Sequence, residues 1–207
     1  GLVLTLGLCW SLRLGLYLLG RTRGKPEDAR YAHLRLEWQS AFAQRLFLFL
    51  QIQALAALPL VLAIYSASGR PGPLDGYDFL GIGIFLLGFF GTALSDWQLA
   101  SFKAHPPNKG SVCTTGLWKF SRHPNYFFEW ITWWSWPVIA LGGASDYPLG
   151  YTALVAPLLM YYLLVHVSGL PLLEAHMERT RGVEFTQYKK ETPIFFPRLF
   201  PTSFTLK

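Results

Sequence analysis

Residues 77–100, YDFLGIGIFLLGFFGTALSDWQLA, form an apolar run long enough to cross a membrane as a single helix. A spanning helix needs about 20 predominantly apolar residues, and this run meets that length. Four small residues recur along it at helical spacing, so that they share a face and allow a second helix to approach closely: Gly81, Gly88, Gly91 and Ser95. The run therefore predicts a transmembrane helix with a close helical neighbour.

Four more apolar runs predict further spans on either side of this one. Breakers rich in glycine and proline separate the runs, which are Leu2–Gly20, Phe42–Tyr65, Tyr126–Leu141 and Leu149–Pro171. Charged residues make up 14% of the chain, against about 25% in soluble domains. We therefore expect an all-α, polytopic transmembrane helix bundle of about five spans, in one domain covering residues 1–207. Because Gly1 lies inside an apolar run, we expect further helices to precede it.

The Lys and Arg residues are concentrated in three segments, which lie outside the spans or, for Arg45, in the first turn of one. All but two of the 18 follow the first span, follow the third span or lie in the carboxyl-terminal tail. Five alternating spans bring those segments to one side, and the positive-inside rule makes that side, with the carboxyl terminus, cytoplasmic. The exceptions are Arg13, within the first span, and Arg70, on the opposite side. The net charge of +6 thus reflects membrane topology, and its distribution argues against a nucleic-acid partner.

Charged residues within the predicted spans need a partner at membrane depth. Arg13 lies about two turns before the end of the first span, where its side chain either extends to the cytoplasmic interface or binds a ligand. Asp96 lies near the cytoplasmic end of the third span, and Lys103 follows seven residues later on the same helical face. An interfacial ion pair is the simpler interpretation of Asp96 and Lys103, and a binding site is the alternative.

The segment GLWKFSRHPNYFFEW, residues 116–130, carries the densest group of polar candidates. Pro124 suits the first turn of a helix, and Asn125 and Glu129 then share one face. The free N–H groups at that helix start, with Arg122 beside them, are suited to bind an anion. Glu129 would lie about one turn into the membrane, where a ligand's ribose or amide would satisfy it. The alternative is a helix cap followed by an interfacial aromatic belt.

Motifs for metal binding and for nucleophilic catalysis are missing from the sequence. The five His residues form no HxxxH or HxxH pair, so a di-iron site lacks its ligands. Cys9 and Cys113 lie in different environments, which argues against a disulfide or a zinc site. We expect no bound metal. The tail that starts at Glu174, taken alone, is typical of an amphipathic interfacial helix.

At several of these positions the chain resembles steroid 5-alpha-reductases and related sterol reductases, and most of all an uncharacterised bacterial branch grouped with them. The resemblance rests on Arg122-His-Pro-Asn-Tyr126 followed by Glu129-Trp130, and it extends over essentially the whole chain. Other matching stretches are Trp10–Tyr17, Ser95-Asp96, Thr115–Leu117 and the tail Glu174-x-His176…Gly182…Tyr188…Pro193.

The resemblance implies a helical membrane reductase that transfers a hydride from NADPH to a double bond of a hydrophobic, lipid- or steroid-like substrate. The cofactor would lie between the cytoplasmic ends of the helices, in a bacterial inner membrane. Lys103 stands where these reductases have an Arg. The positions that match cofactor-binding residues of the family are Arg13, Tyr17, Asp96, Lys103, Trp118, Arg122, His123, Asn125, Tyr126, Glu129, Glu174 and His176.

Two departures from the family pattern bear on the substrate and on packing. Trp10 stands where the steroid enzymes have the Tyr that polarises the substrate ketone, and their partner Glu would precede Gly1. This difference argues against a steroid substrate. The pair Phe127-Phe128 also replaces a Gly of the family ahead of Glu129.

The sequence is also compatible with two other functions. Isoprenylcysteine carboxyl methyltransferases share an Arg-His-Pro-x-Tyr run and a Glu-containing tail, and their cofactor would be S-adenosylmethionine. A membrane scaffold without enzymatic activity would need neither cofactor. Asp96, with the Asn125 and Glu129 pair, favours the reductase. The sequence leaves the substrate, the proton donor and the oligomeric state open.

Overall fold

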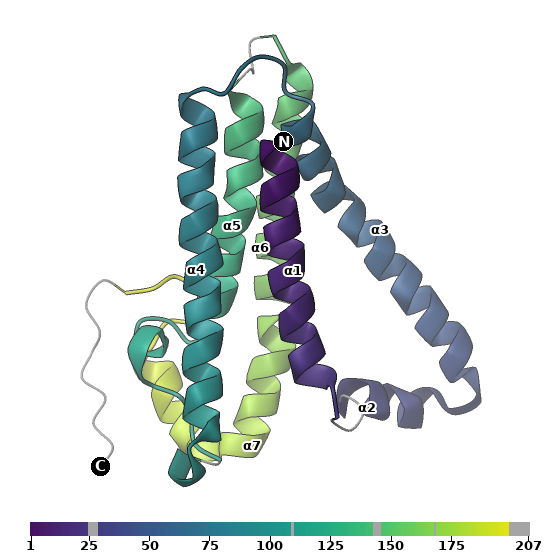
Figure 1. The fold of residues 1–207 in the computed structure, drawn as a ribbon. Helices are drawn as coiled ribbons and strands as arrows, with labels where there is room; N and C mark the ends of the chain where they lie inside the picture. The colour runs from purple at the N-terminus through teal and green to yellow at the C-terminus, as the bar shows by residue number, and fades with distance from the viewer. Residues whose placement is uncertain (25–28, 109, 143–145, 168, 199–207) are drawn as a thin grey trace.

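The chain folds as a bundle of α-helices (Figure 1), and the computed structural model describes residues 1–24, 29–108, 110–142, 146–167 and 169–198. The long helices are α1 (Leu2–Thr22), α3 (Phe42–Ser68), α4 (Gly76–Ala104), α5 (Pro124–Leu141) and α7 (Leu170–Glu191). The shorter elements are α2 (Ala29–Trp38), α6 (Val155–Tyr162), 3-10 helices at Gln39–Ala41, Pro106–Asn108, Gly116–Lys119 and Pro148–Leu154, and a π-helical turn at Leu163–Val167. The predicted all-α fold is confirmed over the described residues.

Four helical stretches are long and apolar enough to cross a membrane, namely Leu2–Gly20, Leu34–Ser68, Gly76–Ala104 and Pro148–Glu191. They identify an integral, multi-pass membrane protein. The predicted span Tyr126–Leu141 forms α5, which is not among the four. Its 18 residues extend over roughly 27 Å, and it lies alongside α4 (Figure 1).

The predicted span Leu149–Pro171 lies within the helical stretch Pro148–Glu191, which is long and apolar enough to cross a membrane, and it consists of several helical pieces. A 3-10 helix ends at Leu154, α6 follows, and the π-helical turn precedes α7. Proline cannot donate to the helical hydrogen-bond ladder, and Pro157 and Pro171 both lie in first turns, where that donor is not needed. These prolines therefore favour separate helix starts over a continuous helix.

The contact between α4 and α5 is the most extensive among the described elements, and it confirms the predicted face of small residues. A Cβ atom added to Gly88 would lie 2.5 Å from the backbone N of Thr132 and 2.7 Å from the carbonyl O of Phe128. At Gly91, an added Cβ would overlap the ring of Phe128. Glycine at these positions therefore makes room for the bulky Phe128 and sets how closely the two helices approach.

Among the described residues, helix α3 buries side chains only near its carboxyl-terminal end. Its buried residues are Ala63, Ser66 and Ala67, all in its last turns, and Ser66 Oγ lies 2.8 Å from Thr152 Oγ1. The other end diverges from the bundle and continues into α2 (Figure 1). Phe47, at that end, is 66% exposed. The described structure thus holds α3 by its carboxyl-terminal third.

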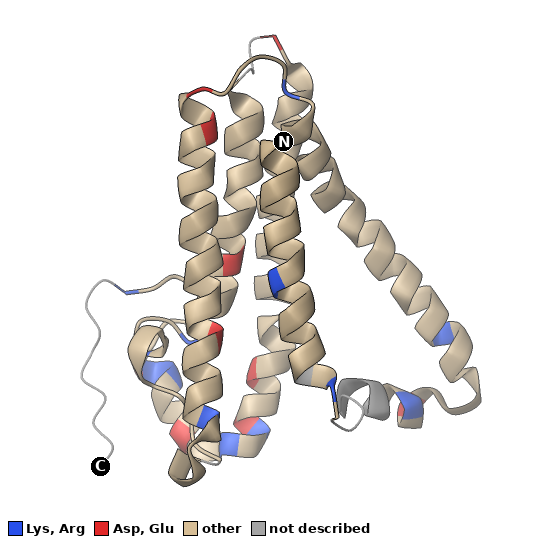
Figure 2. Ribbon diagram, viewed as in Figure 1, with Lys and Arg blue, Asp and Glu red and all other residues tan. Residues whose placement is uncertain are grey.

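Lys and Arg residues are concentrated at one end of the bundle, as the charge pattern of the sequence predicts. Figure 2 shows most Lys and Arg at the end where α1 and α4 finish and α7 lies, and we call this the basic end. Arg70 lies at the opposite end, in the connection between α3 and α4. Arg13 lies near the middle of α1.

Candidate functional site

Charged and aromatic side chains of α1 and α5 meet inside the bundle. Glu129 accepts a hydrogen bond from Trp10 Nε1 at 2.7 Å and pairs with the guanidinium of Arg13. Trp10 and Arg13 are three residues apart, so one face of α1 presents both donors. The side chains of Arg13 and Glu129 are only 12% and 15% exposed. The pair is therefore largely shielded from solvent.

A second carboxylate connects α4 to this group. Asn125 Nδ2 donates to Asp96 Oδ1 at 3.0 Å, and Asp96 Oδ2 lies 3.9 Å from Arg13 Nη1. Asn125 and Glu129 lie on one face of α5, as their spacing predicts. We call Trp10, Arg13, Asp96, Asn125 and Glu129 the interhelical network, because they come from three helices that are distant in sequence.

The interhelical network holds charge in an apolar environment. Arg13 lies between two carboxylates, and its guanidinium carbon is 5.8 Å from the ring centre of Phe89, within cation–π range. An isolated charge at membrane depth is costly, so the opposite charges stabilise one another. Arg13 Nε is buried without a hydrogen-bond partner among the described residues. The network therefore keeps one unused donor.

Arg122 and Glu174 form a second buried cluster nearer the basic end. Arg122 Nε donates to Glu174 Oε1 at 2.7 Å, and Arg122 Nη2 donates to Glu174 Oε2 at 3.1 Å. Such a bidentate pair fixes geometry as well as charge. His123 Nε2 lies 3.0 Å from the same Glu174 Oε1. The pair joins the start of α5 to α7, across 52 positions of sequence.

His123 is the residue that precedes α5, and it is enclosed by its neighbours. Its side chain is 5% exposed, and its ring packs against that of Tyr126 with centroids 5.8 Å apart. Burial lowers the pKa of His123 below its ordinary 6.5, against the opposing effect of the Glu174 carboxylate. The neutral imidazole is therefore the stable form, with Nε2 as the donor to Glu174.

The remaining predicted site residues differ in how they relate to these two clusters. Trp118 is buried and donates its indole N–H to the carbonyl of Ser95 at 3.1 Å. Tyr17 is 37% exposed on α1, and Lys103 is exposed in the last turn of α4. His176 is exposed on α7, and among the described residues its side chain has no hydrogen bond, ion pair or ring contact with either cluster. The expected convergence thus holds for Arg13, Asp96, Asn125 and Glu129, and it does not extend to His176.

Sequence reasoning missed two parts of this arrangement. It treated Trp10 only as a departure from a family position, although Trp10 lies one helical turn from Arg13 and so faces the same partner. It also treated Arg122 and Glu174 as separate ligand contacts, although opposite charges in two buried segments indicate a possible pair. No local pattern in the sequence shows which acidic residue of the chain pairs with Arg122.

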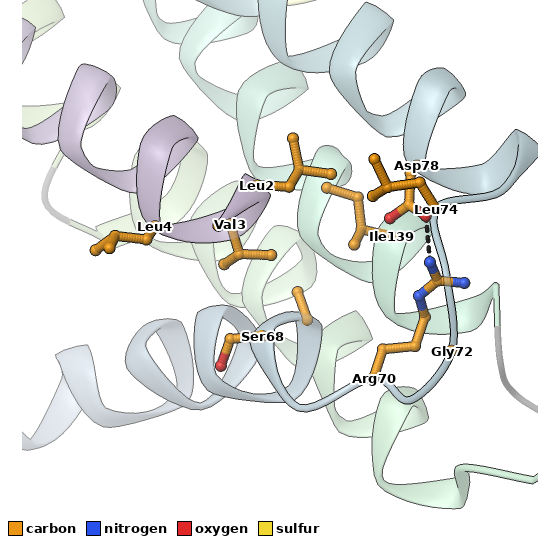
Figure 3. Close-up of a pocket in the computed structure, with 11 residues that line it drawn as sticks. Leu2, Val3, Leu4, Ser68, Arg70, Gly72, Leu74, Asp78 and Ile139 are labelled. Carbon is orange, nitrogen blue, oxygen red and sulfur yellow. Dashed lines mark hydrogen bonds and ion pairs between the residues drawn. The ribbon is translucent and has the colours of Figure 1, made fainter.

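The end opposite the basic end holds another ionic group and a cavity. Arg70 Nη1 lies 2.7 Å from Asp75 Oδ2, and Arg70 also pairs with Asp78, which is 2% exposed. Asp75 and Asp78 form a capping box at the start of α4. A cavity of about 230 Å³ lies beside Arg70 and Asp78, between the starts of α1 and α4 (Figure 3). Its other walls are mainly apolar, as Leu2, Val3, Leu74 and Ile139 in Figure 3 show.

Comparisons with known proteins place the chain in a family without assigning an activity to it. No curated protein and no solved structure is matched by the sequence. A family match covers residues 1–192, and therefore includes the interhelical network, the Arg122–Glu174 pair and all described helices. The chain belongs to the family described as "Protein of unknown function (DUF1295)".

Proposed function

We propose that this protein is a membrane reductase that uses NADPH to reduce a double bond of a hydrophobic, lipid-like substrate. The observation that carries the proposal is the interhelical network. Polar residues in membrane helices are costly and mark functional sites by default. Here a cation, two carboxylates and an amide from α1, α4 and α5 lie together, at positions that resemble cofactor-binding positions of steroid 5-alpha-reductases.

The chemistry of the network fits the uncharged polar parts of a nicotinamide cofactor. Asn125 donates a hydrogen bond to Asp96 through Nδ2, so the Oδ1 atom of Asn125 can accept a hydrogen bond from a ligand. Arg13 Nε is an unused buried donor. A carboxamide or a ribose offers both donors and acceptors to such groups. When bound, the nicotinamide supplies the hydride, and the protein binds and orients it.

The basic end fits the anionic parts of the same cofactor. Lys103 is exposed in the last turn of α4, and Lys119 is exposed at the end of the 3-10 helix Gly116–Lys119. Lys and Arg near a site attract phosphates over distances of a Debye length. An additional phosphate favours NADPH over NADH at such a surface. We therefore propose that the cofactor extends from the basic end toward the interhelical network, in a bacterial inner membrane.

S-adenosylmethionine-dependent methyl transfer is the second candidate, because the sequence also resembles methyltransferases that catalyse it. The Arg-His-Pro-x-Tyr run and the tail Glu are the features that resemble isoprenylcysteine carboxyl methyltransferases. In this chain Arg122 and Glu174, one from each feature, are in direct contact. That contact supports both candidates, whereas Asp96 with Asn125 supports the reductase.

Titration of the purified protein with NADPH and with S-adenosylmethionine separates the candidates. We expect saturable NADPH binding that Glu129→Gln weakens by tenfold or more, because it removes the charged hydrogen bond that holds Arg13, a proposed cofactor contact, and such a bond contributes about 1.5–3 kcal/mol. Glu178→Gln is the matched control, because Glu178 is exposed on α7 and lies outside the network. Saturable binding of S-adenosylmethionine alone would refute the reductase, and binding of neither cofactor would favour a scaffold.

A further inference from the structure

The segment that joins α4 to α5 is held on one side by α4. Trp118 Nε1 donates to the carbonyl of Ser95 at 3.1 Å, and the backbone N–H of Leu117 donates to Gln98 Oε1 at 2.9 Å. Trp118 is 7% exposed. These bonds fix the 3-10 helix Gly116–Lys119 against the last turns of α4, a short distance along the chain from Asp96.

The end of α7 and the residues after it hold the same segment from the other side. Ser121 Oγ donates to the carbonyl of Phe195 at 2.9 Å, and the backbone N–H of Arg122 donates to the carbonyl of Pro193 at 2.9 Å. The Tyr188 hydroxyl hydrogen-bonds to the carbonyl of Trp118. We call residues 192–198 the terminal strap. Its Phe195 is 2% exposed, so the strap is anchored by packing as well as by hydrogen bonds.

Arg122 uses most of its side-chain donors inside this arrangement. Nε and one Nη2 hydrogen bind Glu174, while Nη1 donates to the carbonyls of Lys189 at 3.2 Å and Thr192 at 2.6 Å. Those carbonyls lie at the carboxyl-terminal end of α7, where a cation is favoured by the helix dipole. The side chain is 8% exposed. A guanidinium committed in this way has little capacity left for a ligand phosphate.

We infer that Arg122 and Glu174 are positioning residues, which fix the first turn of α5 so that Asn125 meets Asp96. Asn125 follows Arg122 by three residues, and its side chain is the link between α5 and α4 in the interhelical network. Any movement of the α5 start relative to α7 shifts Asn125 directly. The inference rests on the proposed function only for its effect on cofactor affinity, and the geometric part stands without it.

A double-mutant cycle with Arg122→Lys and Glu174→Gln tests this role. Each substitution keeps a polar side chain but removes the bidentate ion pair. Because both act through one contact, we expect each to weaken NADPH binding by roughly tenfold and the double variant to be no weaker than either single one. If Arg122 contacts the cofactor itself, Arg122→Lys weakens binding in the Glu174→Gln background as strongly as in the wild type, which would overturn the inference.

Hydrogen–deuterium exchange supplies a readout that is independent of any cofactor. We expect both variants to raise exchange in peptides covering residues 118–127 and 186–198, and to leave residues 77–95 of α4 unchanged. Glu178→Gln is the matched control on the same helix, since it breaks an exposed pair with Lys189 and is expected to alter neither region. Unchanged exchange at 118–127 in both variants would overturn the inference. Failure of NADPH to bind the wild type would instead count against the proposed function alone.

Discussion

Trp10 donates its indole N–H to the Glu129 carboxylate across 2.7 Å, although 119 positions separate them in sequence. The Trp10 ring is held edge-on against Trp133, with ring centroids 5.3 Å apart. Glu129 and Trp133 are four residues apart on α5 and so share a face. One turn of α5 therefore supplies both the acceptor and the packing surface for Trp10, which specifies how α1 lies against α5.

Arg13→Met is expected to destabilise the protein by about 3–5 kcal/mol, because it leaves Glu129 buried with its main counter-charge removed. Thermal unfolding in detergent, followed by circular dichroism, measures the change. The double variant Arg13→Met with Glu129→Gln removes both charges and is expected to recover a substantial part of the loss. A double variant that is as unstable as Arg13→Met would contradict the ion-pair explanation.

Gly88→Ala is expected to lower the unfolding midpoint, because its methyl group has no space between α4 and the backbone of α5. Overpacking of this kind typically costs about 1–3 kcal/mol. Gly83→Ala, on the same helix, is the control, since nothing lies within 4 Å of an added Cβ there. That variant is expected to be neutral or more stable, as alanine favours helix formation. Equal effects at the two positions would show that the close approach of α4 and α5 is not a constraint.

The buried His123 is expected to make stability fall as the pH drops below about 6.5. Its pKa is lowered in the folded protein, so the unfolded chain binds the proton first and gains stability relative to the fold. Above pH 6.5 both states are neutral at this residue, and its contribution is constant. Unfolding midpoints between pH 5 and pH 7.5 measure the effect, and His123→Gln should flatten the profile in that range. An unchanged slope in this variant would assign the dependence to other groups.

The spans and the convergence of the interhelical network were predictable from the sequence for simple reasons. Apolar runs of sufficient length form membrane helices. Arg13, Asp96 and Glu129 each lie roughly one to three turns from the basic end of their helices, so helices that alternate in direction bring them to similar depths. Asn125 follows because it shares a face with Glu129.

Other features depend on contacts that no local pattern encodes. From the sequence we expected a ligand to supply the hydrogen-bond donors for Glu129, whereas in the structure Arg13 and Trp10 supply them. The broken path through Leu149–Pro171 depends on packing and on prolines that a hydropathy pattern ignores. Arg122 pairs with Glu174 because α7 and the terminal strap pack against the start of α5, and that packing involves residues distant in sequence.

The attachment of α3 near one end has a consequence for how the protein responds to its surroundings. The buried residues Ala63, Ser66 and Ala67 fix one end of α3, while Phe47, toward the other end, is exposed. Bilayer thickness and lateral pressure should therefore tune the tilt of α3 while α4 and α5 keep their spacing.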